Sequence, residues 1–198
     1  MTTAPCSKRP DSATRRAQLL DAADAVFTAH GVNVPLEQII AHARVGRATL
    51  YRQFPDRQAL LLALMERSAE HLSAYARQLP PQPDNFFALL AHMAERTVRS
   101  PALVDYWRTT SLSDARFTAV RQRVWDVFAP ALARAQSAGL VRADIGPSDI
   151  ALLSGMLAAA QRGPTEAARR RLSQQALDIL RRGLLPSSAV QTPSEGAA

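Results

Sequence analysis

Cysteine and long apolar runs are scarce in this sequence of 198 residues. Cys6 is the single cysteine, which excludes an internal disulfide and any cysteine-based zinc site. The longest uninterrupted apolar run covers residues 59–65, far short of the roughly 20 residues that a membrane-spanning helix needs. Residues 1–17 are polar and contain proline, so they lack the apolar segment of a secretory signal. We therefore expect a soluble cytoplasmic protein with no membrane partner.

Aromatic residues make up only 6% of the chain and glycines number 8, whereas 47% of the residues are hydrophobic. That apolar content is sufficient for one large domain or two small ones. Strands favour aromatic and β-branched residues, and alanine is the best helix former, so this alanine-rich composition predicts helices. Apolar residues recur with the 3.6-residue helical period in almost every segment, and no alternating run indicates a strand.

We accordingly predict an all-α chain of about nine helices between two polar ends. The ends, residues 1–12 and 186–198, are expected to form a disordered basic arm and a disordered tail. Gly31 and Gly139 are expected to end helices, and the Asp56 side chain to cap one. The helices are predicted at residues 13–29, 35–43, 46–53, 56–78, 84–99, 101–110, 114–138, 148–162 and 165–184.

Lysine is nearly absent: Lys8 is the only one among the 24 basic residues, so arginine carries almost all of the positive charge behind the net +7. This bias is compatible with a GC-rich genome, which says nothing of function. It is equally compatible with anion binding, because the guanidinium fork suits phosphate. Residues 44–57 hold four arginines against Asp56 alone, so the basic excess there is compact.

Residues 35–64 have the most informative spacing, with two short helices joined by a tight turn at 43–45. Leu50 and Phe54 are predicted to pack inward against residues of the two preceding helices. A short basic helix with hydroxyl groups, held on a three-helix platform, is suited to the DNA major groove. An ordinary helical hairpin with a solvated arginine face fits the same spacing. The residues on the outward face are Arg47, Ala48, Thr49, Tyr51 and Arg52.

A longer pattern of residues surrounds this segment. Its members are Leu19, Leu20, Ala22, Ala23, Phe27, Gly31, Ile40, Ala41, Val45, Thr49, Leu50, Tyr51, Phe54, Pro55, Asp56 and Arg57. In these residues, the segment 16–60 resembles the helix-turn-helix domain of TetR-type transcriptional regulators. Residues 135–150 resemble the C-terminal half of one group of such regulators. The resemblance implies a DNA-binding domain at 13–60 and a helical effector-binding and dimerisation domain at 61–185.

The resemblance also implies roles for individual residues at a DNA interface. Tyr51 and Thr49 would offer hydroxyls to phosphates, Arg57 would clamp a phosphate beside a helix N-terminus, and Arg47 would read a guanine edge. Basic residues before and within the first helix, Lys8, Arg9, Arg15 and Arg16, would follow the adjacent backbone or minor groove. The full set expected to bind DNA is Arg44, Arg47, Ala48, Thr49, Tyr51, Arg52, Gln53 and Arg57.

Two departures from the family pattern lie beside the turn. Arg44 stands where the family usually has glycine, and a left-handed backbone there would cost on the order of 1 kcal/mol. Val34 and Pro35 replace the threonine or serine that commonly caps the second helix and contacts a phosphate. Neither change removes a core residue of the motif.

The C-terminal part should contain an effector pocket and a dimer interface, and its large side chains fit an ordinary core equally well. Ligand-binding candidates are Met93, Tyr106, Trp107, Phe117, Trp125 and Met156, with His92, Asp105 and Arg108 as polar partners. An intramolecular core or a dimer interface would use Ile150, Leu153, Leu157, Ala160, Leu172, Ala176, Ile179, Leu180 and Leu184, with Gly155, Ala158 and Ala159 allowing close approach.

The resemblance therefore implies a homodimer that binds a pseudo-palindromic DNA operator as a repressor and is released by a small-molecule effector. An enzyme is the first alternative, but the four histidines lie on different predicted helices without metal-ligand spacing. We expect no catalytic residues, cofactor or metal. A helical interaction protein that has lost DNA binding is the second alternative. Arg44 favours that reading, and the basic face of the short helix opposes it.

Overall fold

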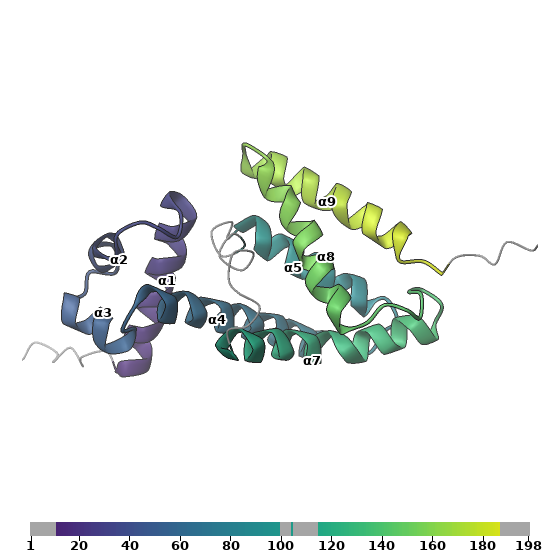
Figure 1. The fold of residues 1–198 in the computed structure, drawn as a ribbon, viewed down its shortest axis with the longest axis horizontal. Helices are drawn as coiled ribbons and strands as arrows, with labels where there is room; N and C mark the ends of the chain where they lie inside the picture. Colours follow the sequence, from purple (N-terminus) through teal and green to yellow (C-terminus); the bar gives the residue numbers. More distant parts are fainter. Residues whose placement is uncertain (1–10, 100–103, 105–114, 187–198) are drawn as a thin grey trace, which may run out of the picture. The chain divides into compact units, whose positions relative to one another are not determined.

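The computed structural model of the chain describes residues 11–99, 104 and 115–186, and this part is helical without strands (Figure 1). The all-α prediction is confirmed. The described elements are α1 (Ser12–His30), α2 (Leu36–Ala43), α3 (Arg47–Gln53), α4 (Arg57–Gln78), α5 (Asn85–Arg99), α7 (Ala115–Ser137), α8 (Pro147–Ala158), the 3₁₀-helix η1 (Ala159–Arg162) and α9 (Glu166–Gly183). The helix predicted at 101–110 lies outside the described residues.

Helix ends follow local chemistry that the sequence displays. Asp11 caps α1 by accepting a hydrogen bond from the Thr14 N–H at 2.7 Å, so Asp11 and Ser12, which were assigned to the arm, belong to the start of this helix. Asp56 caps α4 in the same way, accepting from the Ala59 N–H at 2.7 Å as predicted. Gly31 and Gly139 end α1 and α7 with φ of 83° and 68°, conformations that favour glycine.

The chain divides into two compact units, one of residues 1–68 and 100–117 and the other of residues 69–99 and 118–198. The helix α4 runs from the first unit into the second. None of the helices in the described part of the chain is long and apolar enough to cross a membrane.

The first unit has a small core enclosed by α1, α2, α3 and the start of α4. Four side chains at the centre of this core are each at most 1% exposed and join α1, α2 and α3: Phe27, Ile39, Leu50 and Phe54. The prediction that Leu50 and Phe54 pack inward is confirmed. Arg67 ties α4 back to α1, because its guanidinium bonds the Asp21 carboxylate at 2.5 Å and the Leu20 carbonyl at 3.2 Å.

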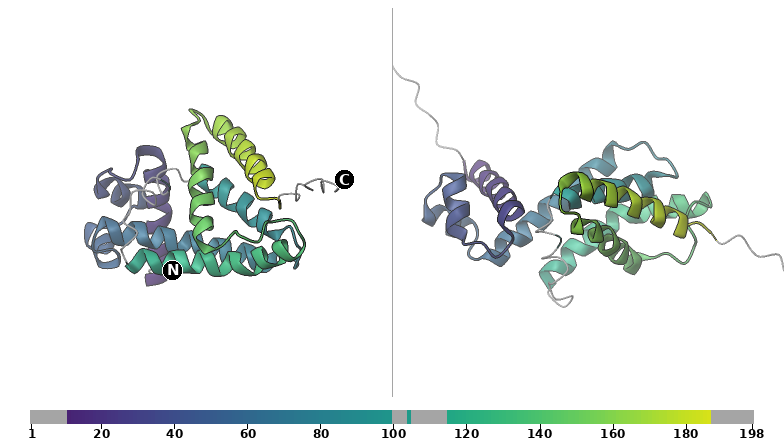
Figure 2. Two further views of the ribbon diagram at one scale, coloured as in Figure 1. Left: turned by 45° about the vertical axis from the view of Figure 1, so that its right-hand side comes forward. Right: turned by 90° about the horizontal axis from the view of Figure 1, so that it is seen from above.

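The second unit packs the C-terminal half of α4 with α5, α7, α8 and α9 (Figure 2). Phe86 and Phe128 meet edge to face in its core, with ring centroids 5.8 Å apart. The loop after α7 is held by the Gln136 amide, which donates to the carbonyls of Arg142, Ala143 and Ile145 at 3.0–3.3 Å. An ion pair of 2.9 Å between Glu95 and Arg170 joins α5 to α9.

The corner between η1 and α9 is unusually tight. A Cβ atom on Gly163 would lie 2.6 Å from the Arg169 backbone nitrogen. The backbone φ of Gly163 is −62°, which any residue adopts, so space rather than conformation requires glycine here.

For most of the apolar residues predicted to form either a core or a dimer interface, the structure favours the core of their own unit. Ile150, Leu153 and Leu157 are at most 5% exposed and belong to the core of their own unit, as do Ala160 and Leu184. Leu172, Ala176 and Leu180 are half-buried against that core or beside it. The large apolar side chains left exposed on α8 and α9 are Leu152 (57%), Met156 (46%) and Ile179 (63%), of which Ile179 belongs to the predicted set.

Candidate nucleic-acid interface

The turn between α2 and α3 depends on one left-handed residue. Arg44 has φ 53° and ψ 43°, and it is the only non-glycine residue with positive φ in the described part of the chain. The N–H groups of Arg44 and Val45 close the end of α2 by donating to the carbonyls of Ala41 and Ile40, at 3.2 and 3.3 Å. A left-handed arginine costs roughly 1–2 kcal/mol relative to an ordinary backbone.

This turn presents α3 with one face inward and the other to solvent. Leu50 faces the core and is fully buried, whereas Thr49 and Gln53 are half-buried. The outward side is basic and carries one aromatic ring, since Tyr51 is 36% exposed. The exposed residues of the turn and of this face are Arg44, Arg47, Ala48, Tyr51 and Arg52. Arg47, Ala48, Tyr51 and Arg52 face outward as the spacing predicts, whereas Thr49, which was also expected there, is half-buried.

Arg47, the first residue of α3, has two neighbours within its own unit. A guanidinium nitrogen lies 3.6 Å from a carboxylate oxygen of Glu37 on α2, and both side chains are exposed. The guanidinium carbon also lies 5.5 Å from the centre of the Tyr51 ring, within cation–π range. Sequence reasoning missed Glu37, because only the angle between α2 and α3 brings it to Arg47.

Gln53 and Arg57 are more strongly engaged inside the unit than the other predicted DNA-binding residues. The Gln53 amide donates to the Ser12 hydroxyl at 2.9 Å, which fastens the end of α3 to the start of α1. Arg57 is half-buried and donates from one guanidinium nitrogen to the Val32 carbonyl. This bond uses one of the two terminal nitrogens of the guanidinium group.

The structure describes some, but not all, of the other residues predicted to lie at the interface. Arg16 lies over the Phe54 ring at 4.5 Å, and Arg15 is half-buried on α1. Pro35 precedes α2 and makes no side-chain cap, as expected from the missing serine or threonine. Lys8 and Arg9 lie outside the described residues.

The predicted effector residues that the structure describes differ in burial. Met93 and Trp125 are half-buried beside the same core of the second unit, and Phe117 is buried. Met156 is exposed, and Tyr106, Trp107, Asp105 and Arg108 lie outside the described residues.

His92, a predicted polar partner of the ligand, stacks on Tyr75 with ring centroids 4.1 Å apart. Its Nε2 atom is buried and makes no hydrogen bond to the described part of the chain. Burial lowers the pKa of the imidazole, and the positive charges of Arg96 and His71 lower it further.

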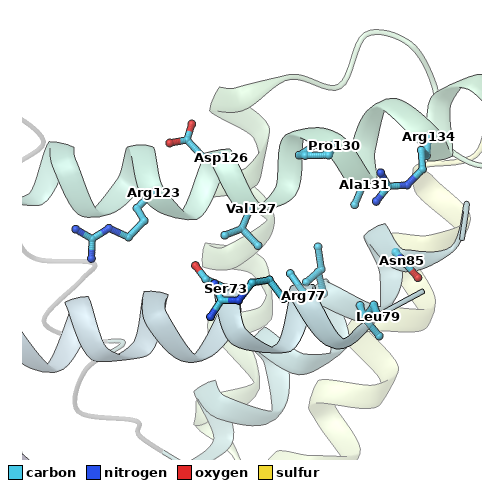
Figure 3. A pocket seen from close by; sticks show the side chains of 12 residues that line it. Ser73, Arg77, Leu79, Asn85, Arg123, Asp126, Val127, Pro130, Ala131 and Arg134 are labelled. Atoms are coloured by element: carbon cyan, nitrogen blue, oxygen red, sulfur yellow. The ribbon is translucent and has the colours of Figure 1, made fainter. Parts of the chain in front are cut away.

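An open groove that sequence reasoning missed lies between α4, α5 and α7 in the second unit (Figure 3). Its volume is about 400 Å³, and none of the predicted effector residues lines it. Arginines of α4 and α7 line the groove. They are far apart in the sequence, so only the folded structure shows that they share one groove. No group of three metal-binding side chains occurs among the residues that the structure describes.

A helix-turn-helix with an exposed basic recognition helix defines a class of DNA-binding proteins. Residues 19–64 match the model of the bacterial regulatory proteins of the TetR family. Residues 82–186 match the model of the C-terminal domain of SbtR-like transcriptional regulators. The chain therefore belongs to the TetR family of DNA-binding transcription regulators, which are not enzymes.

Several solved structures are similar over nearly the whole chain. The TetR transcriptional regulator SCO0520 from Streptomyces coelicolor has 27% identity and a TM-score of 0.62, covering 87% of this chain and 99% of that one. A TetR regulatory protein from Mycobacterium vanbaalenii has 28% identity and a TM-score of 0.61, covering 89% and 98%. RolR in complex with resorcinol shares the fold at 21% identity and a TM-score of 0.55, covering 90% and 91%. No curated protein sequence matches the chain.

Proposed function

We propose that this protein is a homodimeric repressor that binds a pseudo-palindromic operator and is released by a small-molecule effector. It would act in the cytoplasm, where a bacterial chromosome lies. The observation that carries the proposal is the exposed arginine and tyrosine face of α3, set outward by the left-handed turn at Arg44 and fixed from behind by Leu50. The DNA-binding domain would span residues 13–60, and residues 61–185 would sense and dimerise.

Each exposed residue of this face has a contact that its chemistry favours. Arg47 reads a guanine edge with two hydrogen bonds, a contact worth roughly 1–3 kcal/mol of discrimination. Tyr51 and Thr49 donate hydroxyl protons to phosphate oxygens, and Arg44 faces the DNA backbone. Arg57 clamps a phosphate with the nitrogens that Val32 leaves free. Arg52, Gln53 and Ala48 complete the contact surface.

A second copy of the chain is the partner that the exposed apolar residues of α8 and α9 favour. Leu152, Met156 and Ile179 lie on two helices that pack against each other, and each is at least 46% exposed. Two such helix pairs would form a four-helix bundle about a two-fold axis. Binding to one face of the duplex then requires recognition helices about 34–36 Å apart.

The effector site is proposed among the large side chains of the second domain: Met93, Tyr106, Trp107, Phe117, Trp125 and Met156. Small-molecule recognition on this fold is supported by RolR, which was solved with resorcinol, and by gamma-butyrolactone receptors of similar structure. Effector binding among these helices would change the spacing of the recognition helices and so reduce operator affinity.

Fluorescence anisotropy with a duplex from beside the protein's own gene, compared with a scrambled duplex, tests the proposal. Tyr51→Ala and Arg57→Ala should weaken binding to both duplexes and reduce the salt slope by about one per lost contact. Arg47→Ala should weaken mainly the specific duplex, by roughly ten- to one-hundred-fold. Equal losses on both duplexes for Arg47→Ala would remove it as a base reader, and identical affinity of the native protein for both would overturn sequence-specific regulation.

A further inference from the structure

The guanidinium group of Arg67 on α4 is held by three acceptors on α1. One terminal nitrogen donates to the Asp21 carboxylate at 2.5 Å, and the other donates to the Leu20 carbonyl at 3.2 Å. The second nitrogen also lies 3.8 Å from the Asp24 carboxylate. The Arg67 side chain is only 20% exposed, so these acceptors replace much of the water around its charge. Because a guanidinium is planar and its donors point in fixed directions, these bonds set the angle between α4 and α1 as well as their distance.

Arg67 lies where α4 leaves the first unit. That unit takes in residues 1–68, and Leu64, one turn earlier, is the last residue of α4 that belongs to its buried core. Apolar packing is non-directional, so the core by itself specifies the angle of the two helices less sharply than hydrogen bonds do. The bonds of Arg67 act beyond the end of this packing.

A second arginine fastens the start of the same helix. Arg57 donates to the carbonyl of Val32, which lies between α1 and α2. Arg57 and Arg67 are ten residues apart, which is about 15 Å along a helix. Two fixed points at this separation define a direction, so the bonds of both arginines orient α4 against the helices that carry the recognition face.

We propose that Arg67 is a positioning residue that determines which spacing of DNA half-sites the protein accepts. This inference rests on the proposed homodimer, in which each α4 carries one recognition helix and the two must lie about 34–36 Å apart. Each inserted base pair moves a half-site by about 3.4 Å along the duplex. Helices α1–α3 held at one angle on α4 fit one spacing, whereas a loosened joint lets them turn to fit others. Arg67 acts in this way without contacting DNA.

A spacing preference is the measurement that tests this role. The duplexes are the operator from beside the protein's own gene and versions with one or two base pairs inserted between its half-sites. In fluorescence anisotropy the native chain should bind the inserted duplexes at least one-hundred-fold more weakly than the operator. Arg67→Met, which keeps an unbranched apolar stem, should lose no more than tenfold between the same duplexes. Its binding to a single half-site should stay within twofold of native, whereas a folding defect would weaken every duplex alike.

Further variants locate the effect. Asp21→Ala removes one acceptor from a side chain that is 74% exposed and should relax the spacing preference in the same direction. The double variant Arg67→Met with Asp21→Ala should relax it no further than Arg67→Met alone, because both changes break the same bond. The matched control Arg77→Met removes an exposed arginine of α4 in the second unit and should keep the native preference. Circular dichroism melting checks that each variant folds, and Asp21→Ala carries the test if Arg67→Met does not.

The possible outcomes separate this inference from the function on which it rests. A native preference that both Arg67→Met and Asp21→Ala retain would overturn the role of Arg67 and leave the repressor proposal intact. Equal relaxation in Arg77→Met would also overturn it, because loss of any arginine of α4 would then suffice. A native chain that binds every spacing equally would overturn the dimeric operator proposal together with this inference.

Discussion

Arg44 is the residue whose conformation most clearly departs from what its side chain prefers. The turn between α2 and α3 needs a left-handed residue, and an arginine occupies it with φ 53°. The resemblance to the family pointed to this position, because the family usually has glycine there, but the left-handed conformation itself is seen only in the structure. The arginine remains exposed beside the basic face of α3, so it adds its positive charge to that face.

We predict that the free energy of unfolding of Arg44→Gly is about 1 kcal/mol higher than that of Arg44→Ala. Both variants lose the same charged group, so the difference reports the strain of a left-handed alanine less the larger backbone entropy that glycine loses on folding. Urea denaturation followed by circular dichroism measures it. An alanine variant as stable as the glycine variant would show that the turn is not left-handed in solution. Both should lose the same affinity for DNA.

Glu37 is the acidic residue that stands beside the proposed base reader. Its carboxylate lies 3.6 Å from Arg47 and would face phosphate oxygens when DNA is bound, because the first helix of such a motif crosses the DNA backbone. We predict that Glu37→Gln raises the affinity for both specific and scrambled duplexes by a few-fold at low salt, consistent with about 0.2–1 kcal/mol for exposed pairs. Asp178→Asn, which removes one exposed charge from α9, should leave DNA affinity unchanged. A weaker affinity of Glu37→Gln would mean that Glu37 positions Arg47 rather than competing with DNA.

At the scale of helices, apolar periodicity and the residues that cap or end helices predicted most elements, because the interactions that form them are local. Asp56, Gly31 and Gly139 act on residues three or four positions away, so their effects can be predicted from the sequence. The sequence did not predict which face of α8 is buried. That helix carries leucines on two faces, and only the packing of α5 and α9 decides that Leu153 is buried and Leu152 exposed. The groove was missed for the same reason.

The pairing of α4 with α5 through Tyr75 and His92 makes stability depend on pH. The folded-state pKa of His92 lies below its ordinary value of 6.5, so the unfolded chain binds more protons as the pH falls. We predict that this contribution to stability is present above pH 6.5 and is lost as the pH falls below that value. His92→Phe keeps a ring against Tyr75 without a proton to gain. Urea denaturation between pH 8 and 5.5 should show a smaller loss of stability in His92→Phe than in the native chain, and equal losses would contradict the assignment.

At the scale of the whole molecule, the proposed function depends on assembly into a dimer as much as on the recognition face. The exposed Leu152, Met156 and Ile179 form the surface on which we expect a second copy. We predict that Ile179→Glu gives a monomer in sedimentation equilibrium and loses at least one-hundred-fold in affinity for a two-site operator. Binding to a single half-site should be nearly unchanged, because each recognition helix is intact. The matched variant Ala133→Glu adds the same charge to an exposed position of α7 and should remain a dimer. A dimeric Ile179→Glu would place the interface elsewhere.

The tight corner between η1 and α9 has a consequence for natural variation. A methyl group on Gly163 has no room beside the Arg169 backbone, so descendants of a common ancestor should keep this residue invariant even where neighbouring exposed positions drift. An alignment of close homologues in which the glycine is freely exchanged for larger residues would mean that the corner opens in those lineages.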